Sequence, residues 1–207
     1  PGGTARSVAS PGSGRYVYLT TISDSETNAN AVRVYDISDI DTIRQASTPI
    51  TGDGTAPNVV KRPIDITLGT IDTKDFIFVA DSTSLRIVDR DDPTALTVLD
   101  TIMTEPADGG SRIRTVAIFN TDTTDNDTLF VADPGVTQDL IRIIDDNFLT
   151  VDNTNIDGRA ASGGSAAALA SYDYDTGGDD YLYVAAGLGG FKNYEGDDLT
   201  TVVDATR

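Results

Sequence analysis

The chain of 207 residues carries 33 Asp and Glu against 15 Lys and Arg, a formal net charge of −18, and it contains no Cys, no His and one Met. This charge argues against nucleic acid or an anionic membrane surface as the partner, because both favour clustered Lys and Arg. The composition also excludes disulfides, thiolate or imidazole metal sites, and catalysis by a Ser-His or Cys-His pair. No run approaches the roughly 20 apolar residues that a membrane-spanning helix needs.

The predicted elements are strands, and one strand-turn-strand pattern recurs four times. Each copy joins an aromatic-aliphatic run to a second run that ends in an acidic residue: YVYLT (16–20) and AVRVYD (31–36), FIFVA (76–80) and SLRIVD (84–89), TLFVA (128–132) and LIRIID (140–145), and YLYVA (181–185) and GFKNYE (190–195). Alternation and β-branched residues favour strands. The excess of Asp (30) over Glu (3) favours turns over helices.

Two weaker strands flank each copy and complete a four-stranded unit. Runs rich in small residues precede the copies at 5–10, 63–69, 113–119 and 165–171, and further runs follow them at 42–50, 95–102, 147–153 and 199–205. Four units of about 50 residues, each an antiparallel meander, predict an all-β fold, a β-propeller of four blades with four strands each. We expect a single domain, 1–207, with blades at about 1–54, 55–107, 108–160 and 161–207.

The order of the predicted strands bears on how such a ring closes. The chain opens on the first strand of one unit and ends on the fourth strand of another, so no blade is expected to combine strands from both ends. Two interpretations stay open. One is a complete four-bladed ring, closed by packing of the last blade on the first, and the other is a piece of a larger propeller.

The units YVYLT…AVRVYDISDID, FIFVAD…SLRIVDRDDP and LFVAD…LIRIIDD resemble the LVIVD-type repeat of bacterial and archaeal surface proteins. That repeat reads aromatic-x-aromatic-Val-Ala-Asp, then Leu-Arg-Ile-Val-Asp, then an Asp-Pro turn. The resemblance touches all four units, although the fourth has Phe191-Lys192-Asn193-Tyr194-Glu195 in place of the Arg-Ile-Val-Asp core. It implies a β-propeller with a secreted or surface location, and no particular activity.

Basic and acidic residues three apart recur in the predicted third strands: Arg33 with Asp36, Arg86 with Asp89, Arg142 with Asp145, and Lys192 with Glu195. Residues three apart on a strand point to opposite faces. We therefore expect each charge to meet a neighbouring strand or blade, as a structural ion pair or turn cap. A ring of functional arginines is the alternative.

Two Asp-rich turns are candidate calcium sites, and their candidate ligands are Asp122, Asp125 and Asp127 in one turn and Asp173, Asp175 and Asp179 in the other. Calcium takes six to eight oxygen ligands, several of which alternating Asp residues around a sharp turn can supply. The second turn lacks the full D-x-D-x-D-G loop with its distal Glu, and a solvated hairpin turn is the alternative for both. Asn126 also begins an N-glycosylation sequon.

The sequence does not specify one molecular function. The leading hypothesis is a non-enzymatic, extracellular or cell-surface structural propeller that self-associates into a filament or layer, or forms a module of a larger surface protein. The alternative is a propeller that binds a glycan, a protein or Ca²⁺ through a loop face or the axial channel, with the insertion 23–30 as a place for a specific contact. The third is a hydrolase or lyase with two converging carboxylates, although the chain has no Trp for a sugar platform. No catalytic residue, and no cofactor other than Ca²⁺, is predicted.

Overall fold

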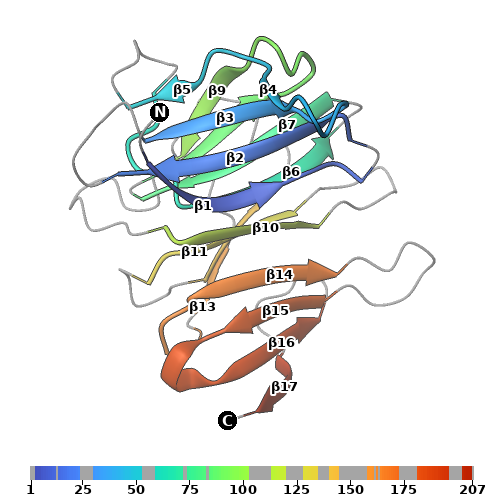
Figure 1. The fold of residues 1–207 in the computed structure, drawn as a ribbon. Helices are drawn as coiled ribbons and strands as arrows, with labels where there is room; N and C mark the ends of the chain where they lie inside the picture. Colours follow the sequence, from blue (N-terminus) through green and yellow to red (C-terminus); the bar gives the residue numbers. More distant parts are fainter. Residues whose placement is uncertain are drawn as a thin grey trace. The chain divides into compact units, whose positions relative to one another are not determined.

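A computed structural model describes residues 3–12, 14–23, 30–52, 59–71, 74–82, 84–102, 113–119, 128–134, 140–144, 158–160, 162, 164–172, 181–195 and 202–206. The chain divides into two compact units, Pro1–Thr101 and Ile102–Arg207. Each unit holds two antiparallel sheets, and the strands of each sheet follow one another in chain order (Figure 1). Each sheet has the meander of a propeller blade, and we number the blades 1 to 4 along the chain. The single domain that the repeat predicts stays a prediction.

The first unit contains blades 1 and 2. Their strands are β1 (Thr4–Ala9), β2 (Tyr16–Ile22), β3 (Ala31–Asp36), β4 (Arg44–Gln45) and β5 (Ile50–Thr51), then β6 (Asp65–Ile71), β7 (Lys74–Asp81), β8 (Ser84–Asp89) and β9 (Thr97–Ile102). Both β4 and β5 pair with β3, so two short strands form the outer edge of blade 1. The predicted fourth strand at 42–50 is therefore divided in two.

The second unit contains blades 3 and 4. Their elements are β10 (Thr115–Phe119), β11 (Thr128–Ala132), β12 (Leu140–Ile144) and β13 (Gly158–Ala160), then β14 (Ala168–Tyr172), β15 (Tyr181–Ala185), the 3₁₀ turn η3 (Gly187–Gly189), β16 (Phe191–Glu195) and β17 (Val202–Thr206). Within the described part of the chain, no helix is long and apolar enough to cross a membrane.

The four meanders confirm the predicted all-β fold, and one predicted strand differs. Residues 147–153 lie outside the described residues, and the fourth described strand of blade 3 is β13, which follows that run in the chain. β13 pairs with β12 through Leu140 and Ala160. A three-residue strand at a sheet edge is defined by its backbone pairing, so it carries little of the side-chain pattern from which strands are predicted.

Blades 1 and 2 share one buried core, to which both blades contribute apolar side chains. Blade 1 contributes Tyr18 of β2 and Val34 of β3, whereas blade 2 contributes Ile77 and Val79 of β7. All four side chains are fully buried. Because side chains alternate along a strand, Tyr18 lies on the face of blade 1 that is turned toward the next blade, and Ile77 and Val79 lie on the face of blade 2 that is turned toward the preceding blade.

Blades 3 and 4 pack in the same way within the second unit. Phe130 of β11 occupies the position of Tyr18 and packs with Leu182 and Val184 of β15, which occupy the positions of Ile77 and Val79. All three are essentially fully buried. The first strands of consecutive blades also meet, since the hydroxyl of Ser171 donates to the backbone oxygen of Ile118 at 2.5 Å. Each unit therefore contains the same interface between consecutive blades.

Candidate functional site

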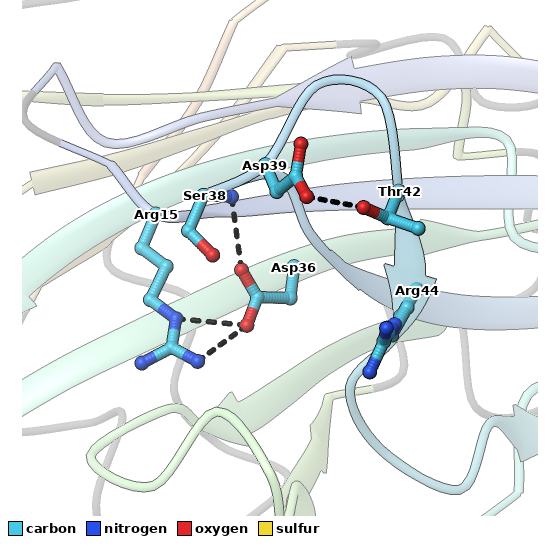
Figure 2. A pocket seen from close by; sticks show the side chains of 6 residues that line it. All are labelled: Arg15, Asp36, Ser38, Asp39, Thr42 and Arg44. Carbon is cyan, nitrogen blue, oxygen red and sulfur yellow. Dashed lines mark hydrogen bonds and ion pairs between the residues drawn. The ribbon is translucent and has the colours of Figure 1, made fainter.

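A polar pocket of about 280 Å³ opens on blade 1. Its six lining residues are Arg15, Asp36, Ser38, Asp39, Thr42 and Arg44. Arg15 precedes β2, Asp36 ends β3, Arg44 begins β4, and the other three residues come from the turn between β3 and β4. Figure 2 shows Asp36 between the two arginines. The pairing of three consecutive strands thus gathers these polar side chains at one end of the sheet.

The wall of the pocket is a turn held by Asp side chains. Oδ1 of Asp36 accepts from the backbone N–H of Ser38 at 2.9 Å, and Oδ1 of Asp39 accepts from the backbone N–H of Asp41 at 3.0 Å. Asp39 also accepts the hydroxyl proton of Thr42 (Figure 2). Asp side chains that bond to backbone N–H groups two residues later form Asx turns, which fix the chain without a helix or strand.

Blade 2 repeats this turn between β8 and β9. Asp89 accepts from the N–H of Asp91 at 2.9 Å, and Asp92 accepts from the N–H and the hydroxyl of Thr94 at 2.8 and 2.6 Å. The two Asp residues that build the turn therefore belong to the repeat, and they alone do not distinguish the pocket of blade 1.

The two arginines are what distinguish blade 1. The backbone oxygen of Arg15 accepts from Ile37 at 2.8 Å, and in blade 2 the oxygen of Asp75 accepts from Arg90 at 2.9 Å. Asp75 therefore occupies the position of Arg15 and carries the opposite charge. Eight residues after the Asp that ends the third strand, blade 1 has Arg44 and blade 2 has Thr97.

Arg15 and Asp36 form a two-pronged ion pair on one side of the pocket. Nε and Nη2 of Arg15 donate to Oδ2 of Asp36 at 2.8 and 2.5 Å (Figure 2). The hydrogen bonding from Arg15, together with that from Ser38, holds the pKa of Asp36 well below its usual range. The hydroxyl of Thr42 and the N–H of Asp41 likewise lower the pKa of the Asp39 carboxyl. Both carboxylates therefore stay ionised at neutral and mildly acidic pH.

The side chain of Arg44 has no hydrogen-bond or ion-pair partner among the residues that the structure describes. Its backbone lies opposite Asp36 in the β3–β4 pairing, and opposite residues of an antiparallel pair project from the same face. The side chain is exposed, and its guanidinium offers five N–H donors. The pocket thus presents the unpaired guanidinium of Arg44 beside the ionised carboxylates of Asp36 and Asp39.

The predicted calcium ligands Asp122, Asp125, Asp127, Asp173, Asp175 and Asp179 lie outside the described residues, as does Asn126. Calcium binding at those turns stays a prediction. Within the described ranges, no three His, Cys, Asp or Glu side chains are grouped so that they could hold a metal ion. Of the insertion 23–30, only Ser23 and Asn30 are described.

The pocket on blade 1 was not predicted from the sequence. Its Asp, Ser and Thr residues have the composition of an ordinary turn, which conceals any binding role. The available signal was the departure of blade 1 from the repeat, with Arg15 and Arg44 where blade 2 has Asp75 and Thr97.

No family model matches the sequence, and no curated protein matches it either. Solved structures do match. The periplasmic gluconolactonase of Pseudomonas aeruginosa gives a TM-score of 0.62 at 16% identity, over 99% of this chain and 53% of its own. An exo-β-1,3-galactanase of Clostridium thermocellum gives a TM-score of 0.56 at 14% identity, and the match covers 97% of this chain and 47% of the galactanase. An α-L-arabinofuranosidase of the same organism gives a TM-score of 0.55 at 11% identity, and the match covers 98% of this chain and 72% of the arabinofuranosidase.

These structures are β-propellers, so the chain has a β-propeller fold. It spans about half the length of the first two structures. The LVIVD-type repeat gains no support from the family models, and the filament or layer gains none from the solved structures. The prediction that the chain is not an enzyme is wrong, because the similar structures with this fold are enzymes: a lactonase and two glycosidases. We based it on the lack of Cys and His, and a fold of this kind is compatible with carboxylate chemistry.

Proposed function

We propose that the protein is a carbohydrate-binding β-propeller, and that the pocket of blade 1 binds a small sugar that carries a carboxylate. The observation that carries the proposal is Arg44, an exposed guanidinium without a partner among the described residues, next to two ionised carboxylates. A guanidinium binds a carboxylate through two parallel N–H···O bonds. The nearby Asp36 and Asp39 offer acceptors for sugar hydroxyl groups.

The similar structures support a carbohydrate as the class of ligand. Each of the three is named for action on a sugar or a sugar lactone: a gluconolactonase, a galactanase and an arabinofuranosidase. The periplasmic location of the gluconolactonase also supports an extracytoplasmic location for this chain, which we propose with the sugar-binding function.

The pocket supplies binding groups, and neither of its carboxyl groups suits the role of general acid. Glycoside hydrolysis needs one carboxylic acid whose pKa is raised, so that it holds a proton to give to the leaving group. Here hydrogen bonds from Arg15 and Thr42 lower the pKa of both Asp36 and Asp39. We therefore assign to both residues the binding and orientation of sugar hydroxyl groups.

Isothermal titration calorimetry tests the proposal with glucuronate and galacturonate against glucose and galactose. We expect the acids to bind at least about tenfold more tightly, because a hydrogen bond to a charged group contributes about 1.5–3 kcal/mol. Arg44→Gln should reduce the affinity for the acids to that for the neutral sugars. Arg114→Gln, an exposed arginine in blade 3, is the matched control and should leave binding unchanged. No binding by the wild type, or equal binding by Arg44→Gln, would contradict the proposal.

A further inference from the structure

Tyr16 and two charged residues of the pocket form one row across blade 1. Tyr16 of β2 lies opposite Asp36 of β3, and Asp36 lies opposite Arg44 of β4. Opposite residues of antiparallel strands project from the same face of a sheet. The guanidinium carbon of Arg15 lies 5.3 Å from the centre of the Tyr16 ring, so the two arginines lie at opposite ends of this row with Asp36 between them (Figure 2). All four residues belong to the first unit.

Arg15 keeps hydrogen-bond donors for a ligand although it is paired with Asp36. A guanidinium carries five N–H groups, and two of those of Arg15, on Nε and Nη2, donate to Oδ2 of Asp36. The other three, including both on Nη1, have no partner within the described part of the chain. The side chain is 61% exposed, and the ion pair and the Tyr16 ring hold the guanidinium in place. Its free donors are therefore accessible and fixed in direction.

The two arginines differ in the charge that they require from a ligand. Asp36 already balances the charge of Arg15, whereas the side chain of Arg44 has no ion-pair partner among the described residues. A second carboxylate placed at Arg15 would lie beside the ionised Asp36, and like charges at such a distance repel each other. Arg15 is therefore suited to a neutral acceptor such as an amide carbonyl, which offers lone pairs and brings no charge.

Acceptors for hydroxyl groups complete the pattern of the pocket. A carboxylate has about four lone-pair sites. Asp39 receives one N–H from Asp41 and one O–H from Thr42, so about two of its sites remain for a ligand. The pocket thus combines a cation that lacks a counter-charge, carboxylate acceptors, and a guanidinium whose charge is balanced but whose donors are free.

We propose that the ligand is an N-acylated uronic acid and that Arg15 recognises its amide carbonyl, an inference that rests on the proposed binding of a sugar acid. In a 2-acetamido-2-deoxyhexuronate, the carboxylate on C5 and the acetamido group on C2 lie across the ring from each other, and the hydroxyl groups on C3 and C4 lie between them. The carboxylate binds Arg44, and the carbonyl accepts from Nη1 of Arg15. The hydroxyl groups donate to the carboxylates of the pocket, of which Asp36 lies between the arginines (Figure 2).

Calorimetry with a matched pair of acids tests the proposal. The two probes, 2-acetamido-2-deoxyglucuronate and glucuronate, differ only in the group on C2. We expect wild type to bind the acetamido acid about fivefold to tenfold more tightly, because a carbonyl accepts a hydrogen bond from a charged donor. Arg15→Lys keeps a positive charge beside Asp36 but lacks the fixed, planar N–H groups. This variant should bind both acids equally, with the affinity that wild type has for glucuronate.

The controls separate this inference from the proposed function. Arg6→Lys, at an exposed arginine of β1, should keep the preference for the acetamido acid, and thermal melting verifies that each variant is folded. Arg15→Gln, which also lacks Nη1, serves as a second variant should Arg15→Lys fail to fold. If wild type binds neither acid, the sugar-acid site itself is overturned. If wild type binds both acids equally, the N-acyl group is overturned and the sugar-acid site stands, and a preference that persists in Arg15→Lys overturns the role of Arg15.

Discussion

Arg86 of β8 forms its ion pair with Asp81 of β7, at 3.1 Å from Nε, and not with Asp89 three residues along its own strand. Asp81 is fully buried. It also accepts the backbone N–H groups of Lys61 and Arg62 at 3.0 and 2.6 Å. This agrees with the expectation that charges three apart on a strand meet neighbouring segments. The pair fastens the β7–β8 hairpin to the segment that enters blade 2.

Replacement of Asp81 by alanine should strongly destabilise the protein. The change leaves Arg86 and two backbone N–H groups without their acceptor in a buried place, and removal of one partner of a buried pair costs about 3–5 kcal/mol. Urea denaturation measures the loss in the free energy of unfolding. Asp41→Ala, at an exposed turn position, should change it by less than about 0.5 kcal/mol. Equal effects of the two substitutions would show that the Asp81 ion pair contributes little.

Asp81 also predicts a dependence of stability on pH. Burial raises the pKa of the Asp81 carboxyl, although the N–H groups of Lys61 and Arg62 and the charge of Arg86 oppose the shift. Because the folded state then holds the proton more tightly, this group contributes stability below its unfolded pKa of about 3.9. That contribution is lost as the pH rises from there through the raised folded value. The free energy of unfolding of wild type relative to Asp81→Asn should therefore decrease between pH 4 and pH 7. A difference that grows over this range would contradict the shift.

Gly164 should not tolerate a side chain. A Cβ at this position would lie 1.8 Å from the backbone oxygen of Ala186 and 2.5 Å from the backbone nitrogen of Gly189. Gly164→Ala should therefore lower the free energy of unfolding by about 1–3 kcal/mol, as overpacking does. Gly12→Ala is the matched control, because a Cβ there has no atom within 4 Å. Thermal melting compares the two, and an unchanged melting temperature for Gly164→Ala would refute the expected clash.

Tyr18→Phe should leave the stability unchanged or increase it. The hydroxyl of Tyr18 is buried without a hydrogen-bond partner among the described atoms, and an unpaired buried hydroxyl costs about 1–3 kcal/mol. The ring itself is needed, since it fills the core between blades 1 and 2 and lies 5.6 Å from the guanidinium carbon of Arg90. Tyr18→Ala should thus lose about 3–5 kcal/mol. Chemical denaturation of both variants distinguishes the two roles, and a large loss in Tyr18→Phe would indicate a bonded hydroxyl.

Binding of a neutral sugar at the pocket should vary little between pH 8 and pH 5. Hydrogen bonds from Arg15 to Asp36 and from Thr42 to Asp39 lower the pKa of both carboxyl groups, so they lose their charge only as the pH falls below their ordinary range. Asp36→Asn should weaken binding about tenfold, because the amide holds Arg15 less firmly. Calorimetry at several pH values measures both effects. A marked change in affinity between pH 8 and pH 5 would contradict this prediction and would indicate that another group in the site titrates.

The strands and the faces that they present follow from the local pattern of residues. The two-residue period of runs such as FIFVA and SLRIVD is a local property, so it predicted both the β7–β8 hairpin and the alternation that buries Phe78 and Ile87. It could not locate β13, because a three-residue edge strand has no such period.

The pocket, and the covering of each strand face, depend on tertiary packing. Arg15, Asp36 and Arg44 meet because β2, β3 and β4 pair side by side, and only this pairing turns three separated polar residues into one site. Val8 and Ile66 present the same alternating pattern, yet one is open and the other is buried. The reason is physical: the period of a strand fixes which side chains share a face, whereas the neighbour that covers the face is set by packing between sheets.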